Sequence, residues 1–233
     1  MSIWGKITGI ATGYALGGVP GALVGGLVGH FFMDRSNGAD VTFTIALIAL
    51  AAKMTRADGV VSPIEVEAVN SVLRVPDHER ANMERVFRLA QSDVAGFDSY
   101  ARQIADLYAQ SPQTLEDVLD ILFYIAYADD VLHPAEEQFL EIVAEIFNID
   151  PARVAQIRAR HTPDGVGDPY AILGVTEEAS ADAVRAAYHR AVRDNHPDQM
   201  QARGVPPEML HVATDRMAAI NAAWKLIREA RKI

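Results

Sequence analysis

Residues 180–198 read SADAVRAAYHRAVRDNHPD, and this stretch decides the fold of the C-terminal part of the chain. Ser180 is suited to cap a helix, and Asp182 lies in the first turn, where the helix dipole favours a negative charge. Pro197 cannot lie inside a helix and moves His196 out of the helical region, so the chain turns and exposes His196-Pro197-Asp198. Apolar side chains recur at helical spacing at Val184, Ala187, Tyr188, Ala191 and Val192. The stretch predicts an amphipathic helix that ends in an exposed turn.

A second helix is expected after this turn, antiparallel to the first. It should begin at about Glu208, with Pro207 suited to the first helical turn. Its apolar positions are Leu210, Ala213, Met217 and Ile220, and the set is extended by Ala223, Trp224 and Ile227. Two helices that bury facing apolar stripes predict a helical hairpin.

Three further features place this hairpin among known modules. Residues 168–175 read DPYAILGV, residues 220–227 read INAAWKLI, and Tyr188 stands in register between them. The tripeptide alone would be weak evidence for a functional module, because Pro-Asp is a common turn pair. With its surroundings, roughly residues 167–231, it resembles the J-domain, the module by which DnaJ-type co-chaperones drive ATP hydrolysis in a DnaK-type chaperone.

The resemblance implies which residues bind the chaperone: His196, Pro197, Asp198, Arg185, Arg190 and Arg193. The tripeptide would contact the chaperone where its nucleotide domain meets the linker to its substrate domain. The three arginines would form a positive face that steers the encounter with an acidic surface. Tyr188 would pack inside and hold the two long helices together. Gln199 and His189 stand where basic residues are frequent, which weakens the expected interaction without removing the motif.

Composition bounds the function classes. The 233 residues carry a formal net charge of −10, and residues 168–233 contain nine acidic and nine basic residues, so the excess negative charge belongs to residues 1–167. An acidic domain of this kind disfavours nucleic acid as its partner. The chain has no Cys, which excludes disulfides and agrees with a reducing compartment.

The N-terminal segment predicts a membrane anchor. Residues 7–33 contain no Asp, Glu, Lys or Arg over 27 residues, which as a helix would extend about 40 Å against the roughly 30 Å of a bilayer core. We therefore expect one spanning helix, kinked near Pro20, with aromatic anchors at Trp4 and Phe31-Phe32. A cleaved signal peptide fits less well, because the apolar stretch is long. A hairpin turning at residues 17–21 that dips into the membrane is the other alternative.

Glycines recur every fourth residue along this segment. After Gly5 they are Gly9, Gly13, Gly17, Gly21, Gly25 and Gly29. In a soluble helix each would cost up to about 1 kcal/mol relative to alanine, whereas in lipid the backbone has few alternatives to a helix. The strip left without side chains lets a second helix approach closely, which predicts a homodimer through a right-handed helix pair.

The orientation of the predicted helix in the membrane follows weakly from the flanking charges and more firmly from the implied partner. Lys6 precedes the segment, while Arg35 and Lys53 follow it. A module that meets a cytosolic ATPase must lie in the cytoplasm. The expected location is the bacterial inner membrane, crossed once, with the N-terminus in the periplasm and everything after Met33 in the cytoplasm.

Between these ends the sequence repeats itself. Residues 57–65 read ADGVVSPIE and residues 128–136 read ADDVLHPAE. Ser62 is a suitable N-cap, Pro63 a suitable first helical residue, and Glu65 completes a capping box. The second copy keeps Pro134 and Glu136 and places His133 at the cap. Helices are expected over residues 41–55, 77–91, 97–110, 115–127 and 151–160, with an amphipathic helix after each repeat, and no alternating strand pattern appears, so the class is all-α.

Four acidic residues of the repeat are low-ranked metal candidates: Asp58, Glu65, Asp129 and Glu136. They would converge if the two halves packed about a pseudo-twofold axis, and four carboxylates suit a hard cation such as Ca²⁺. The spacing is not that of an EF-hand. The simpler interpretation, which we prefer, is that these acids begin and end helices. No metal and no cofactor is predicted.

The repeat region resembles the TerB-like domain of tellurite-resistance proteins. Joined to a membrane segment and a C-terminal J-domain, it resembles the DjlA family of membrane-anchored co-chaperones, as do residues 3–9 (IWGKITG) and residues 202–210 (ARGVPPEML). The expected organisation is an anchor over 1–35, a TerB-like all-helical domain over 36–160, a linker over 161–167 and a J-domain over 168–233. The expected function is that of a co-chaperone that activates a partner ATPase and recruits it to the membrane, not an enzyme. The alternative is an adaptor or a metal- or tellurite-response protein acting through the TerB-like domain.

Overall fold

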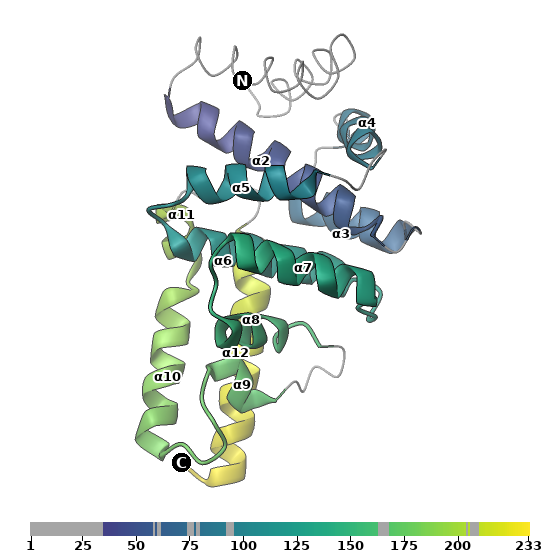
Figure 1. Ribbon diagram of the computed structural model, residues 1–233. Coiled ribbons are helices and arrows are strands. Elements are labelled where there is room, and N and C mark those ends of the chain that lie inside the picture. The colour runs from purple at the N-terminus through teal and green to yellow at the C-terminus, as the bar shows by residue number, and fades with distance from the viewer. Residues whose placement is uncertain are drawn as a thin grey trace.

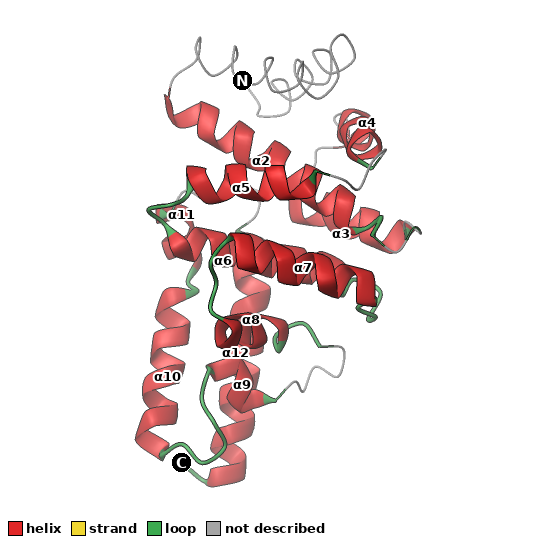
Figure 2. Ribbon diagram, viewed as in Figure 1, coloured by secondary structure: helices red, strands yellow, loops and turns green. Residues whose placement is uncertain are grey.

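The computed structural model describes residues 35–57, 59, 62–73, 77, 80–91, 96–162, 168–203, 205 and 210–233. Within these ranges the regular elements are all helices (Figure 2), which confirms the predicted all-α class. The predicted spanning helix, its kink and its glycine strip lie outside the described residues. Among the helices that are described, none combines the length and the apolar character needed to cross a membrane.

In the part of the chain that the structure describes, seven helices form a central bundle: α2 (Arg35–Met54), α3 (Pro63–Leu73), α4 (Arg80–Ala90), α5 (Phe97–Leu107), α6 (Pro112–Ala126), α7 (Pro134–Ile146) and α8 (Pro151–Arg158). Helix α6 lies in the interior of the bundle, where it contacts α2, α3, α7 and α8 (Figure 1). Val118, Leu119, Ile121 and Leu122 on α6 are inaccessible to solvent. A helix that is buried on nearly every side must be apolar almost all round.

The two copies of the repeat begin α3 and α7 in the same way. Pro63 and Pro134 are the first helical residues. The Ser62 N–H donates to the Glu65 carboxylate at 2.7 Å, and the His133 N–H donates to the Glu136 carboxylate at 3.0 Å. The Ser62 hydroxyl also accepts from the Ile64 N–H, at 3.1 Å. The predicted start of the helix after the first repeat is confirmed, with Pro63 as the first helical residue and the Glu65 side chain accepting from the Ser62 N–H. The second copy has the same arrangement, with Glu136 accepting from the His133 N–H.

Among the described residues after 167, four helices are present: α9 (Pro169–Leu173), α10 (Ala181–Asp194), α11 (Pro197–Ala202) and α12 (His211–Arg231), and this group is called here the hairpin after its two long helices, α10 and α12. Helices α10 and α12 run antiparallel (Figure 1) over a small core of Ile172, Leu173, Val184, Ala187, Ala191, Ile220, Ala223 and Ile227. The Ser180 hydroxyl accepts from the Ala183 N–H at 3.2 Å, as expected of an N-cap. Tyr188 is only half-buried, but it joins the two helices as predicted, stacking on Trp224 with ring centroids 4.8 Å apart and donating to Asn221 at 3.1 Å.

The hairpin departs from the prediction in two places. The chain does not simply turn at Pro197 but enters the short helix α11, in which Pro197 is the first residue and His196 the N-cap. Helix α12 begins at His211, later than the predicted start at about Glu208, and residues 206–209 lie outside the described ranges. Both differences arise where one end of the hairpin meets the central bundle.

The two groups of helices share a core at that end. Met200, Val205, Val212 and Ala213 from the hairpin are buried within the apolar core of the central bundle. Ala213 and the partly buried Leu210, predicted to pack against the other helix of the hairpin, instead pack here. The end of the hairpin that carries the tripeptide is therefore the end that packs against the central bundle.

Candidate functional site

The tripeptide lies at the junction between α10 and α11, with His196 and Asp198 exposed and Pro197 half-buried. Helix α10 ends at Asp194, and His196 caps α11 by accepting the Asp198 N–H on its Nδ1 atom at 3.3 Å. The same Nδ1 atom lies 3.5 Å from the Asp198 carboxylate. The side chains of His196 and Asp198 are 51% and 85% exposed. The imidazole and the carboxylate are therefore accessible to solvent at the start of α11, where Pro197 is the first helical residue.

The basic residues of α10 are all exposed, as expected from the sequence. Arg185 pairs with Asp182 at 2.9 Å and Arg193 with Asp194 at 3.1 Å, while Arg190 is also exposed on this helix. At the spacing of an ideal helix the three positions span a sector of about 140°. The prediction that they form a positive face for a partner remains a prediction, because exposure alone does not identify what binds there.

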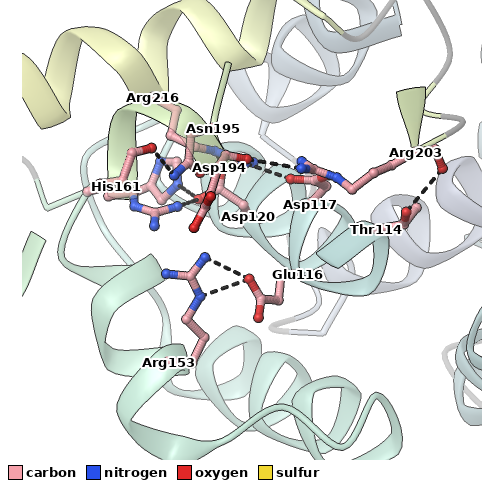
Figure 3. A network of polar contacts seen from close by, with 12 residues as sticks. Thr114, Glu116, Asp117, Asp120, Arg153, His161, Asp194, Asn195, Arg203 and Arg216 are labelled. Atoms are coloured by element: carbon pink, nitrogen blue, oxygen red, sulfur yellow. Dashed lines mark hydrogen bonds and ion pairs between the residues drawn. The ribbon is translucent and has the colours of Figure 1, made fainter. Parts of the chain in front are cut away.

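The base of the tripeptide loop is fixed by Arg203, which directly follows α11. Its Nη2 atom donates to the Asp117 carboxylate at 2.7 Å, and its Nη1 atom donates to the Asp194 carbonyl oxygen at 3.0 Å. The Thr114 hydroxyl donates to the carbonyl oxygen of Arg203 at 3.2 Å. Figure 3 shows Arg203 reaching from the hairpin to α6 of the central bundle. The Arg203 side chain thus links the residues on both sides of the tripeptide to α6 of the central bundle.

A second arginine of the hairpin lies deeper in the same network. Arg216, on α12, donates through Nη1 to Asp117 at 2.6 Å and through Nε to Asp120 at 2.8 Å (Figure 3). Asp120 also accepts from Arg160 and lies 3.2 Å from the Nε2 atom of His161. These carboxylates are at most 2% exposed. The two buried acids of α6 are neutralised largely by cations that follow the bundle in the sequence.

Burial and pairing set the ionisation of this network. Burial alone would raise the pKa of Asp120, but Arg216, His161 and Arg160 outweigh it and hold the pKa of that carboxyl well below its usual range. Burial lowers the pKa of Arg160 to about 10, against the attraction of Asp120. Burial likewise opposes the charge on Arg216, yet Asp120 and Asp117 raise the pKa of that guanidinium. Asp120, Arg160 and Arg216 are therefore ionised throughout the physiological range.

This network was not predicted from the sequence, because its members are far apart in the chain. Asp117 and Arg216 are separated by 99 positions. A signal was present in the sequence: Asp117 and Asp120 stand three residues apart within an otherwise apolar stretch that includes Val118, Leu119, Ile121 and Leu122. A helix that is apolar on nearly every side cannot turn such acids to water, so they require buried cations.

The metal candidates converge only in part. Glu65 and Glu136 are hydrogen-bonded to each other through their side chains, and Asp129 lies near enough to act on Glu65. Asp58 is outside the described residues. Burial, partly offset by the Ser62 N–H, raises the pKa of Glu65 to about 8, and Glu136 and Asp129 add to the rise. Within the described ranges, no three His, Asp or Glu side chains are arranged to hold a metal ion. With a pKa raised to about 8, Glu65 is largely protonated at neutral pH.

Three family models match the chain in succession. Residues 1–48 match the co-chaperone DjlA transmembrane domain, residues 44–159 match tellurite resistance protein TerB, and residues 168–233 match the DnaJ domain. Among curated relatives, the co-chaperone protein DjlA of Photobacterium profundum is 26% identical over 231 residues, covering 87% of this chain and 83% of the relative. That of Salmonella typhimurium is 25% identical over 268 residues, covering 99% of each chain. No solved structure matches the chain significantly.

Proposed function

Because the chain belongs to the DjlA family of co-chaperones, with a DjlA transmembrane domain, a TerB domain and a C-terminal DnaJ domain, we propose that it stimulates ATP hydrolysis by a cytosolic DnaK-type chaperone and recruits that chaperone to the membrane. As a DnaJ-domain co-chaperone it is a regulator of a partner and not an enzyme. The observation that carries the proposal is the exposed His196-Pro197-Asp198 turn beside an exposed basic helix.

The proposed mechanism is a shift in the partner's conformational equilibrium. A contact accelerates hydrolysis in another protein only if it binds the hydrolysis-competent state better than the other states. His196 and Asp198 supply the specific contacts, and their orientation is fixed by the capping bond at the start of α11. Arg185, Arg190 and Arg193 raise the rate of encounter, because an acidic partner surface is attracted over several ångströms.

The membrane part of the proposal rests on the N-terminal segment. The match of residues 1–48 to a transmembrane domain supports anchoring. We propose a single crossing over residues 7–33 with the N-terminus in the periplasm, so that the TerB-like domain, from residue 36, and the J-domain, from residue 168, lie on the side of the ATPase. Homodimer formation through the glycine strip belongs to the same proposal. Anchoring would raise the local concentration of the chaperone at the membrane surface.

A steady-state ATPase assay tests the function. The full chain in detergent micelles is titrated into a purified bacterial DnaK-type chaperone with a peptide substrate, alongside His196→Gln and a Gln201→Ala control on the exposed surface of α11. We expect the wild type and Q201A to stimulate hydrolysis equally and H196Q to lose at least about tenfold of the stimulation, with an unchanged circular dichroism spectrum. A wild-type chain without effect on hydrolysis would leave an anchored adaptor in place of a co-chaperone.

A further inference from the structure

We propose that the central bundle positions the His196-Pro197-Asp198 turn, with Asp117 and Arg203 as the positioning residues. The inference rests on the proposed stimulation of a DnaK-type chaperone, because it explains where the geometry of the binding turn comes from. Its basis is that residues 194–205, called here the anchored loop, are fixed to the bundle on both sides of the tripeptide while the tripeptide itself stays exposed.

The first fixed point precedes the tripeptide. Asn195 is 2% exposed, although it directly adjoins the exposed His196. Its side-chain oxygen accepts from Arg216 at 3.1 Å, and its side-chain nitrogen donates to the Ala191 carbonyl oxygen at 2.7 Å. Arg216 is in turn held by Asp117 and the neighbouring acid of α6. The chain therefore enters the anchored loop from a position set by the central bundle.

The second fixed point follows the tripeptide. Met200 is inaccessible to solvent and lies within the core of the central bundle, although it is only two residues beyond the exposed Asp198. The Val205 N–H donates to the Met200 carbonyl oxygen at 3.1 Å, and Val205 is buried in the same core. Because both side chains are buried in the core of the central bundle, the bundle also sets the position at which the chain leaves the anchored loop.

The third fixed point closes the loop. Arg203 bonds the Asp194 carbonyl oxygen, before the tripeptide, and the Asp117 carboxylate on α6, as described above. A planar guanidinium makes both contacts at fixed angles, which a lysine cannot reproduce. The Arg203 side chain is 17% exposed, whereas the Asp117 carboxylate is 2% exposed. Removing the arginine thus disturbs the rim of the network more than its centre.

These contacts matter because α11 is too short to hold its own shape. A six-residue helix is far below the length at which helices are stable in water. Detached from the bundle, the loop would sample many conformations, and a partner that binds one of them sees an apparent dissociation constant raised by the inverse of its population. Positioning therefore lowers the concentration of co-chaperone that gives half-maximal stimulation, and it leaves the stimulation at saturation unchanged.

The test measures both quantities with the full chain in detergent micelles. Arg203→Gln is the main variant, Arg203→Lys the conservative one, and Asp117→Asn the partner variant. Glu116→Gln is the matched control, because Glu116 neighbours Asp117 on α6 but pairs with Arg153 of the bundle at 2.7 Å. We expect R203Q and D117N to raise the half-maximal concentration for ATPase stimulation about three- to tenfold with an unchanged plateau, R203K to recover only part of the shift, and E116Q to behave as wild type.

Hydrogen exchange provides a readout that does not depend on the chaperone. In R203Q the amides of residues 194–205 should exchange faster than in wild type, while those of α6 remain protected. Equal exchange in wild type and R203Q, or an unchanged half-maximal concentration, would overturn the positioning role. A lower half-maximal concentration would also overturn it, since the bundle would then be restraining the turn. If the wild type gave no stimulation, the proposed function would fail, and the exchange comparison would still decide the positioning.

Discussion

At the scale of single residues, Arg216 is a buried cation that pairs with two buried carboxylates. It is 5% exposed and faces both Asp117 and Asp120. Arg216→Met keeps much of the side-chain volume but leaves two buried carboxylates with less positive charge. Removing one partner from a buried ionic group typically costs about 3–5 kcal/mol. We expect a loss of that size in the free energy of unfolding, measured by urea titration.

The matched control for this substitution is Arg228→Met, on the same helix. Arg228 is exposed, and exposed substitutions usually change stability by about 0.5 kcal/mol or less. If R216M and R228M lowered the urea midpoint equally, the buried network would contribute nothing particular to stability.

Glu65 gives a pH dependence with a defined sign. Its pKa is raised from 4.5 to about 8 in the folded chain, so between these values the folded state keeps a proton that the unfolded state has lost. Stability from this group is therefore highest below about pH 4.5 and declines as the pH rises to about 8. Glu65→Gln mimics the protonated form, so E65Q should be more stable than wild type at pH 8, by about 1 kcal/mol or more.

The measurement is the difference in unfolding free energy between wild type and E65Q at pH 5 and pH 8. Taking the difference cancels the titration of other groups that the two chains share. Glu67→Gln, two residues along α3 at an exposed position, should show no such pH-dependent gap. A gap that stayed constant from pH 5 to pH 8 would mean that Glu65 is ionised throughout that range.

At the scale of the elements, the basic surface of α10 predicts a salt-dependent association. Arg185, Arg190 and Arg193 are exposed, so their attraction for an acidic partner is screened by ions. Replacing all three by Gln should lower the association rate with a DnaK-type chaperone about tenfold at low salt, and flatten its dependence on ionic strength. Stopped-flow mixing between 50 and 300 mM salt measures both effects. A triple variant that kept the wild-type salt dependence would show that other charges steer the encounter.

Elements were predictable from sequence where local signals set them. Ser180 caps α10, Pro63 and Pro134 begin α3 and α7, and the apolar spacing along residues 115–127 matches the core of α6, which the structure begins three residues earlier, at Pro112. The short helix α11 and the late start of α12 were not predicted. Their positions depend on Met200 and Val212 entering the core of the central bundle, and that is a tertiary contact without a local signature.

The candidate site was likewise predictable from the sequence only where its residues are close together in the chain. The tripeptide and the arginines of α10 stand in one continuous stretch, so the sequence indicated both their proximity and their exposure. The positioning contacts join Arg203 to Asp117, 86 residues away. Periodicity within one helix cannot show which distant helix supplies the opposite charge.

At the scale of the whole molecule, the glycine strip predicts self-association in the membrane. Exchanging Gly13, Gly17 and Gly21 for Leu fills the surface on which a second helix would pack while keeping the segment apolar. A membrane dimerisation reporter fused to residues 1–40 should lose most of its signal, while fractionation shows that insertion is retained. The same signal from both versions would require another explanation for the repeated glycines.

The shared core at residues 200–213 also has a consequence for how the chain is made. A ribosome releases α6 about a hundred residues before Arg216, which pairs with both Asp117 and Asp120. During synthesis the nascent bundle therefore lacks part of the positive charge that neutralises these two carboxylates. The positions in its apolar core that Met200 and Val212 later occupy are also unfilled. Truncated chains ending before the last helix should emerge loosely packed and protease-sensitive, and the finished protein should become resistant only when its final segment leaves the exit tunnel.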